Sequence, residues 1–87
     1  MYLHLGNDIV VRKAAVLAVF DLDNSSASRL TRDFLAGAQK RGEVVNAAGA
    51  ELPKSFVLCA DGGKQTVYLS QLNSSTLLKR SEGLGLE

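Results

Sequence analysis

The sequence has very little of the chemistry that builds a metal site or a disulfide. Cysteine, histidine and proline each occur once and tryptophan is absent. A single cysteine, Cys59, excludes a disulfide within the chain and a cysteine-based zinc site. Cys59 lies in an apolar stretch, where a thiol behaves as a small hydrophobe. His4 has no ligand partner at metal-binding spacing, and it alternates with Leu3 and Leu5, so we expect it on the opposite strand face in a structural role. No metal and no cofactor are expected.

The sequence also has no long apolar run and no large excess of positive or negative charge. No run approaches the roughly 20 residues of a membrane span, and no charged segment leading into an apolar core marks a signal peptide. We therefore expect a cytoplasmic protein with no membrane contact. Ten Lys and Arg against nine Asp and Glu leave a net charge of +1. Any contact with nucleic acid must come from a local basic patch, because bulk charge provides none.

The basic residues that are present stand mostly in adjacent pairs near the expected ends of elements. The residues that could contact phosphates are Arg12, Lys13, Lys54, Lys79 and Arg80. If several fall on one rim, repetition around an oligomer would multiply a weak phosphate contact. An ordinary solvated surface is the alternative. No helix combines basic residues with Asn or Gln as a recognition helix does, so base-specific readout is not expected.

The longest helix signal covers residues 24–42. The Asn-Ser-Ser at 24–26 offers N-caps, and Gly42 is a suitable residue just after the helix. Gly37 weakens the helix by about 1 kcal/mol relative to Ala, so it needs a sheet to pack against. The apolar residues at helical spacing are Ala27, Leu30, Phe34, Leu35 and Ala38.

Strand patterns occupy much of the remaining chain. A turn at Gly6-Asn7 predicts a hairpin between residues 2–5 and 8–11, and the Asp-Gly-Gly-Lys turn after residue 60 predicts a second hairpin. The apolar run 14–20 suits a strand covered on both faces, by the helix on one side and a second subunit on the other; a buried helix segment is the competing interpretation. The other predicted elements are strands at 43–47, 56–60 and 66–70 and a short helix capped at 73–75.

These elements predict an α+β fold: a small, mainly antiparallel sheet with one principal helix packed on it and a short C-terminal helix. We expect a single domain over residues 1–81 and a flexible tail over 82–87. A chain of 87 residues buries only about 60–65% of its unfolded surface, so its core is thin and self-association would stabilise it.

One stretch is similar to the nucleophile motif of a phosphatase, because Asp21 and Asp23 follow an apolar strand and precede a helix. There, the first Asp attacks phosphorus and the second acts as acid and base around magnesium. Solvation of a strand end and favourable charge at a helix N-terminus explain the same pattern. No second acidic pair follows downstream, so we expect a protein that is not an enzyme, without catalytic residues and without a small-molecule substrate.

Taken in order, residues 1 to about 80 resemble the RemB branch of the RemA/RemB family of extracellular matrix regulatory proteins. The opening Met1-Tyr2-Leu3-His4-Leu5-Gly6 and the closing Ser74-Ser75-Thr76-Leu77 with Lys79-Arg80 are the most specific pieces. The other matching pieces are Val10-Val11, Phe20-Asp21, Phe34-Leu35, Lys54-Ser55-Phe56-Val57 and Val67-Tyr68-Leu69-Ser70.

The resemblance implies a bacterial, cytoplasmic, homo-oligomeric regulator whose RemA branch binds DNA through arginines repeated around an assembly. The chain departs from the RemA pattern. RemA-type proteins carry a cluster of arginines just before the strand that matches residues 55–60, whereas this chain has Ala-Glu-Leu-Pro-Lys at 50–54, where only Lys54 is basic. Arg12-Lys13 also stands beside the other arginine position, which Ala14 occupies. We therefore expect a DNA-associated transcriptional regulator acting as a ring or other closed oligomer. An oligomeric scaffold module that does not touch DNA is the alternative.

Overall fold

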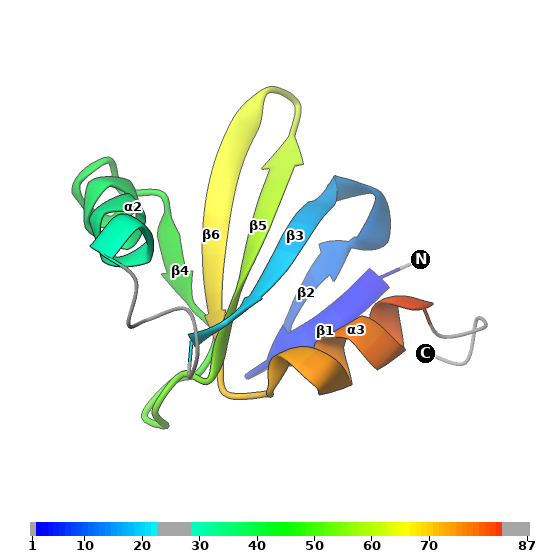
Figure 1. Ribbon diagram of the computed structural model, residues 1–87. Coiled ribbons are helices and arrows are strands. Elements are labelled where there is room, and N and C mark those ends of the chain that lie inside the picture. The colour runs from blue at the N-terminus through cyan, green and yellow to red at the C-terminus, as the bar shows by residue number, and fades with distance from the viewer. Residues whose placement is uncertain (1, 23–28, 83–87) are drawn as a thin grey trace.

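The computed structural model describes residues 2–22 and 29–82 and places them in two sheets and two flanking helices (Figure 1). The elements in chain order are β1 (Tyr2–Gly6), β2 (Ile9–Arg12), the 3-10 turn η1 (Lys13–Ala15), β3 (Val16–Asp21), α2 (Arg29–Lys40), β4 (Val44–Asn46), β5 (Ser55–Asp61), β6 (Lys64–Ser70) and α3 (Ser74–Glu82). A hairpin of β1 and β2 forms the smaller sheet, and the larger sheet has the strand order β3-β5-β6-β4.

The predicted α+β class and its mainly antiparallel strands are confirmed. The β5–β6 hairpin pairs without interruption from Ser55↔Ser70 to Asp61↔Lys64, as its Gly-Gly turn predicts. The short strand β4 lies at an edge, also as predicted, but it runs parallel to β6. That pairing was not predicted, because it depends on α2 carrying the chain back to the start of the sheet.

The first hairpin forms one residue later than predicted. The turn consists of Asn7 and Asp8, with φ of 48° and 63°, and Gly6 pairs with Ile9. Asn and Asp enter the left-handed region more readily than other side chains, which suits a two-residue hairpin turn. Asn7 also donates a hydrogen bond of 2.9 Å from Nδ2 to the carbonyl of Ala47, which ties the turn to the loop after β4.

The prediction of a continuous strand over 14–20 is wrong at its start. Lys13–Ala15 form a 3-10 turn, because the chain must pass there from the hairpin into the larger sheet, and β3 begins at Val16. The sequence pattern also predicted that the principal helix covers β3, and the structure differs on this point. Val16 and Val19 instead pack against the cluster that contains the hairpin and Leu77 of α3, while Phe20 lines a groove beside α2.

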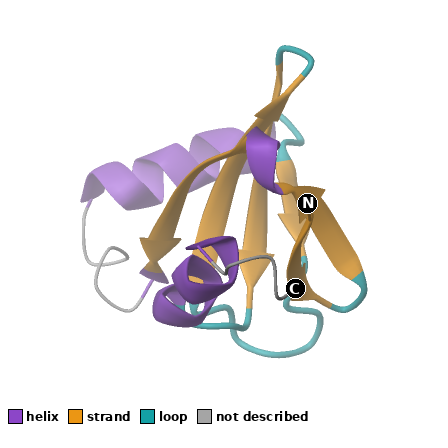
Figure 2. Cartoon of the chain, turned by 90° about the vertical axis from the view of Figure 1, so that its right-hand side faces the viewer, coloured by secondary structure: helices purple, strands orange, loops and turns teal. Residues whose placement is uncertain are grey.

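The larger sheet is apolar on both faces, and a different part of the chain covers each. Leu3, Leu5 and Val11 of the hairpin and Leu77 of α3 pack with Val57 and Cys59 on one face. On the other face Phe34, Leu35 and Ala38 of α2 pack with Phe56 and Val67. The two helices consequently lie at opposite ends of the molecule (Figures 1 and 2).

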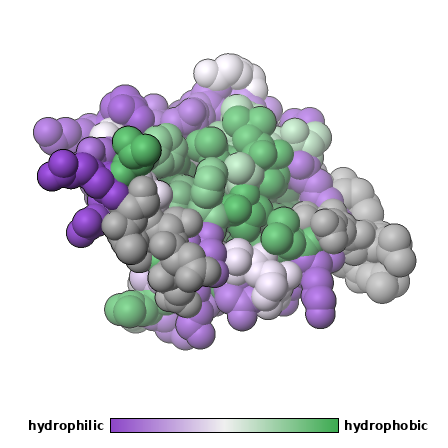
Figure 3. All heavy atoms as spheres, in the orientation of Figure 1, coloured by the Kyte–Doolittle hydropathy of each residue, from purple (hydrophilic) through white to green (hydrophobic). Residues whose placement is uncertain are grey.

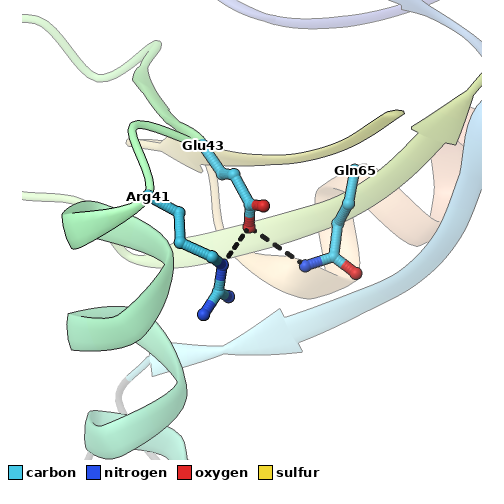
Figure 4. A network of polar contacts seen from close by, with 3 residues as sticks. All are labelled: Arg41, Glu43 and Gln65. Atoms are coloured by element: carbon cyan, nitrogen blue, oxygen red, sulfur yellow. Dashed lines mark hydrogen bonds and ion pairs between the residues drawn. The ribbon is translucent and has the colours of Figure 1, made fainter. Parts of the chain in front are cut away.

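The C-terminal end of α2 is fixed as the sequence predicts. Gly42 has a φ of +71°, and the amides of Gly42 and Glu43 donate to the carbonyls of Gln39 and Ala38 at 3.1 and 2.9 Å. These are the two bonds of a Schellman motif. The Glu43 carboxylate then accepts from Gln65 Nε2 of β6 at 3.3 Å and pairs with Arg41 Nε at 3.2 Å (Figure 4). The network links the helix end to the sheet.

The other helix boundaries agree in part with the predictions. The predicted N-caps at 24–26 lie outside the described residues. Asn73 caps α3 as predicted, since its Oδ1 accepts from the amide of Thr76 at 2.9 Å. That helix extends to Glu82, one residue past the predicted domain boundary, and residues 83–87 of the predicted tail lie outside the described part of the chain.

Candidate functional site

The outer face of the β1–β2 hairpin gathers exposed polar and aromatic side chains. Alternation along β1 buries Leu3 and Leu5 completely, so Tyr2 and His4 point to the other side. Arg12 of β2 is the cross-strand partner of Tyr2, and Val10 is the partner of His4. We call the four exposed residues Tyr2, His4, Val10 and Arg12 the ribbon face.

Basic residues surround the ribbon face. Lys13 follows Arg12 directly, and Arg80 of α3 donates from Nη1 to the carbonyl of His4 at 3.4 Å. Lys79 is exposed and adjacent to Arg80 on the same helix. The Arg12 guanidinium lies 3.6 Å from the carboxylate of Asp61, with both side chains more than half exposed. Such an exposed pair contributes little, so a stronger anion can displace it.

Lys54 lies apart from the other predicted phosphate contacts. It immediately precedes β5, whereas Asp61, the partner of Arg12, ends this seven-residue strand. At about 3.3 Å per residue the two ends are about 20 Å apart. Within one chain Arg12, Lys13 and Arg80 therefore lie at the hairpin, Lys79 lies next to Arg80 on α3, and Lys54 lies at the far end of the sheet.

Tyr2 is the residue that the sequence-based list of contacts missed. It is 57% exposed, and the alternation that placed His4 opposite Leu3 and Leu5 also placed Tyr2 there. The approach of Arg80 to β1 could not be predicted in the same way, because the two contacting residues are 76 positions apart in the chain.

A second notable surface is an apolar groove between α2 and the larger sheet. Its volume is about 210 Å³, and it lies within a broad hydrophobic area bordered by hydrophilic residues (Figure 3). The ring of Phe56 stacks at 4.7 Å on Phe20 and at 6.3 Å on Phe34. Leu30 is 80% exposed at the margin of this groove. We call it the α2 groove; its lining residues are Phe20, Leu30, Thr31, Phe34, Phe56 and Leu58.

The residues considered for catalysis lie only partly within the described part of the chain. Asp21 ends β3, and Asp23 lies outside the described residues. Among residues 2–22 and 29–82 no group of three potential ligands from His, Cys, Asp and Glu forms a metal site. Cys59 is buried as predicted, and burial raises the pKa of its thiol to about 11, which keeps it protonated and unreactive at neutral pH.

No helix within the described part of the chain combines the length and apolar character that crossing a bilayer requires.

Comparison with known proteins agrees with the resemblance seen in the sequence. Residues 2–80 match the family described as RemA-like, extracellular matrix regulatory protein A-like. The chain is also 38% identical over 82 residues to extracellular matrix regulatory protein B of Bacillus subtilis (strain 168). This match covers 94% of this chain and 91% of that protein. Since the family match spans nearly the whole chain, the protein belongs to the RemA-like family of extracellular matrix regulatory proteins.

Proposed function

We propose that the protein is a bacterial, cytoplasmic transcriptional regulator that acts without catalysis as a homo-oligomer on DNA. Its basic residues, Arg12, Lys13, Lys79 and Arg80 around each hairpin, contact phosphates, and the contact is repeated around a ring or other closed assembly. The observation that carries the proposal is the position of Arg12, Lys13 and Arg80, from β2, η1 and α3, at one hairpin. Lys54 joins the same contact only across a subunit boundary.

The α2 groove supports the self-association part of this proposal. Burying a Leu or Phe side chain completely is worth about 1.5–3 kcal/mol, so covering the exposed parts of Leu30 and Phe20 contributes about 2–4 kcal/mol per subunit. Association costs at least about 4 kcal/mol in lost freedom. One groove is therefore insufficient, and a stable contact must bury apolar surface from both partners.

The DNA contact is tested by a mobility-shift titration with duplex DNA at several salt concentrations. The wild-type protein should bind at low salt and lose affinity steeply as salt rises, because phosphate contacts release counterions. Replacing Arg12 and Lys13 together by Gln should reduce the salt slope by about 2 for each subunit that contacts the DNA. A matched control is Lys40→Gln on α2, at the opposite end of the molecule, which should leave the slope unchanged. Absence of any shift at low salt would contradict the proposal.

The oligomer is tested by sedimentation velocity at micromolar concentration. Leu30→Asp should shift the protein toward the monomer, because it places a charge in the α2 groove. Leu30 is mostly exposed in the single chain, so the fold itself should tolerate this change. Leu52→Asp, at an 84% exposed loop position outside the groove, is the matched control and should leave the assembly intact. Equal dissociation by both variants, or a wild-type monomer, refutes the role of the groove.

A protein-interaction scaffold that never touches DNA is the second candidate. The net charge of +1 and the Asp61 carboxylate beside Arg12 favour it. An assembly that persists while every duplex fails to shift at low salt would identify the scaffold.

A further inference from the structure

We propose that the ribbon face is a stacking platform for the unpaired bases of a single-stranded polynucleotide. Tyr2 and His4 present their rings to the bases, and Arg12 and Arg80 hold the neighbouring phosphates. The inference goes beyond the proposed function, which needs only contacts with the backbone of duplex DNA.

The spacing of the two rings carries the first step. Tyr2 and His4 are two residues apart on one strand and on the same side of the hairpin, so their attachment points are about 6.5–7 Å apart. This separation is about twice the 3.4 Å rise per nucleotide of a DNA strand. An extended single strand can therefore place one base on each ring. Aromatic side chains stack with every base because each base has a π-face.

The cations lie where the phosphates of such a strand would run. Arg12 is directly across from Tyr2, which puts their Cβ atoms about 4.5–5.5 Å apart. Arg80 reaches the backbone of His4, and Lys13 follows Arg12 in the chain. Arg12 thus lies across from Tyr2, and the Arg80 guanidinium lies at the backbone of His4. Val10, 43% exposed and across from His4, adds apolar contact.

A duplex cannot use the ring of Tyr2 in this way, because its base faces are already stacked inside the helix. Duplex DNA offers phosphates to Arg12, Lys13 and Arg80, but Tyr2 contributes only when the bases are unpaired. The contribution of the Tyr2 ring therefore separates the two kinds of ligand.

The test measures fluorescence anisotropy of three labelled probes with the full chain at low salt. The probes are a 15-nucleotide oligothymidine, an oligouridine of the same length and a 15-base-pair duplex. Tyr2→Ala should weaken binding of the single strands by roughly 5- to 150-fold, the loss of one stacked base, and should leave duplex affinity unchanged. Tyr2→Phe, which keeps the ring, is the matched control and should bind within about twofold of wild type. The tighter of the two single strands identifies whether DNA or RNA is the natural ligand.

A second readout reports on the ring itself. The chain has no tryptophan and two tyrosines, so a Tyr68→Phe background leaves Tyr2 as the sole tyrosine fluorophore. Its emission should be quenched by the oligothymidine and unaffected by the duplex. Circular dichroism confirms that each variant is folded.

The outcomes separate this inference from the proposed function. Binding of the duplex without binding of single strands overturns the platform and leaves the proposed function intact. Binding of single strands without binding of the duplex overturns the proposed function and leaves the platform intact. Single-strand binding that is unchanged by Tyr2→Ala, or that falls equally for Tyr2→Ala and Tyr2→Phe, also overturns the platform. Failure of all three probes overturns both.

Discussion

At the scale of single residues, two serines fix the larger sheet to the hairpin and to the segment before α3 through directional hydrogen bonds, which hydrophobic contacts alone do not provide. Ser70 and Ser55 are cross-strand partners, and both are completely buried. The Ser70 hydroxyl donates to the carbonyl of Leu5 at 2.6 Å, and the Ser55 hydroxyl donates to the carbonyl of Leu72 at 2.7 Å. The first bond links β6 to the ribbon-bearing hairpin, and the second links β5 to the segment that leads into α3.

Ser70→Ala should therefore lower the free energy of unfolding by about 1–3 kcal/mol, because it leaves the buried carbonyl of Leu5 without its donor. Urea denaturation followed by circular dichroism measures the change. Ser75→Ala is the control, since Ser75 is exposed and should change the stability by less than about 0.5 kcal/mol. Equal stability of the two variants would contradict the structural role given to Ser70.

Cys59 provides a pH test at the same scale. Its pKa is raised by burial from 9.0 to about 11 in the folded chain, so between these values the unfolded chain holds fewer protons. Stability should be unaffected below pH 9 and should fall as the pH rises toward 11. Denaturant midpoints measured from pH 8 to 11 should decline less steeply for Cys59→Ala. Some decline should remain in that variant, because burial also raises the pKa of Tyr68 in the folded protein. Identical pH profiles for the two proteins would count against the expected effect.

At the scale of elements, local signals in the sequence correctly predicted turns and the ends of helices. The Gly-Gly turn specified the β5–β6 hairpin, Gly42 specified the end of α2, and Asn73 specified the start of α3. The η1 turn and the parallel pairing of β4 were missed, because both depend on where distant strands lie. The candidate site shows the same contrast between local and long-range information. The alternation of residues along β1 predicted the face on which His4 lies, but the contact of Arg80 with β1 could be seen only in the folded chain.

Gly37 within α2 and Gly42 just after its C-terminal end should respond to alanine in opposite directions. Gly42→Ala should destabilise the protein by about 1–2 kcal/mol, because Gly42 adopts the left-handed conformation. Nothing lies within 4 Å of the added methyl, so the effect is purely conformational. Gly37→Ala should stabilise by up to about 1 kcal/mol, because the nearest atom, 3.2 Å away, is the flexible end of the Arg41 side chain. Thermal unfolding of both variants decides the point, and destabilisation by Gly37→Ala would show that the Arg41 side chain cannot move aside.

At the scale of the whole molecule, the two surfaces described above lie on different elements. The α2 groove is formed by α2, β3 and β5, whereas the ribbon face is formed by β1 and β2 and flanked by α3. Because they share no residue, a subunit can use both at once. Assembly through the groove should therefore leave the ribbon faces available for repeated contact, and Leu30→Asp should weaken nucleic-acid binding only by removing this multiplicity. Anisotropy titrations of Leu30→Asp should show the affinity of one subunit, with Arg12 still contributing to the salt slope.

The docking of α3 on β1 has a consequence for biosynthesis. Leu77 completes the cluster around Leu3 and Leu5, and Ser70 bonds the carbonyl of Leu5 across 65 positions. The inner face of β1 is therefore covered only after β6 and α3 have been synthesised. The nascent hairpin exposes its leucines until then, so stable folding should begin only after α3 has left the ribosome.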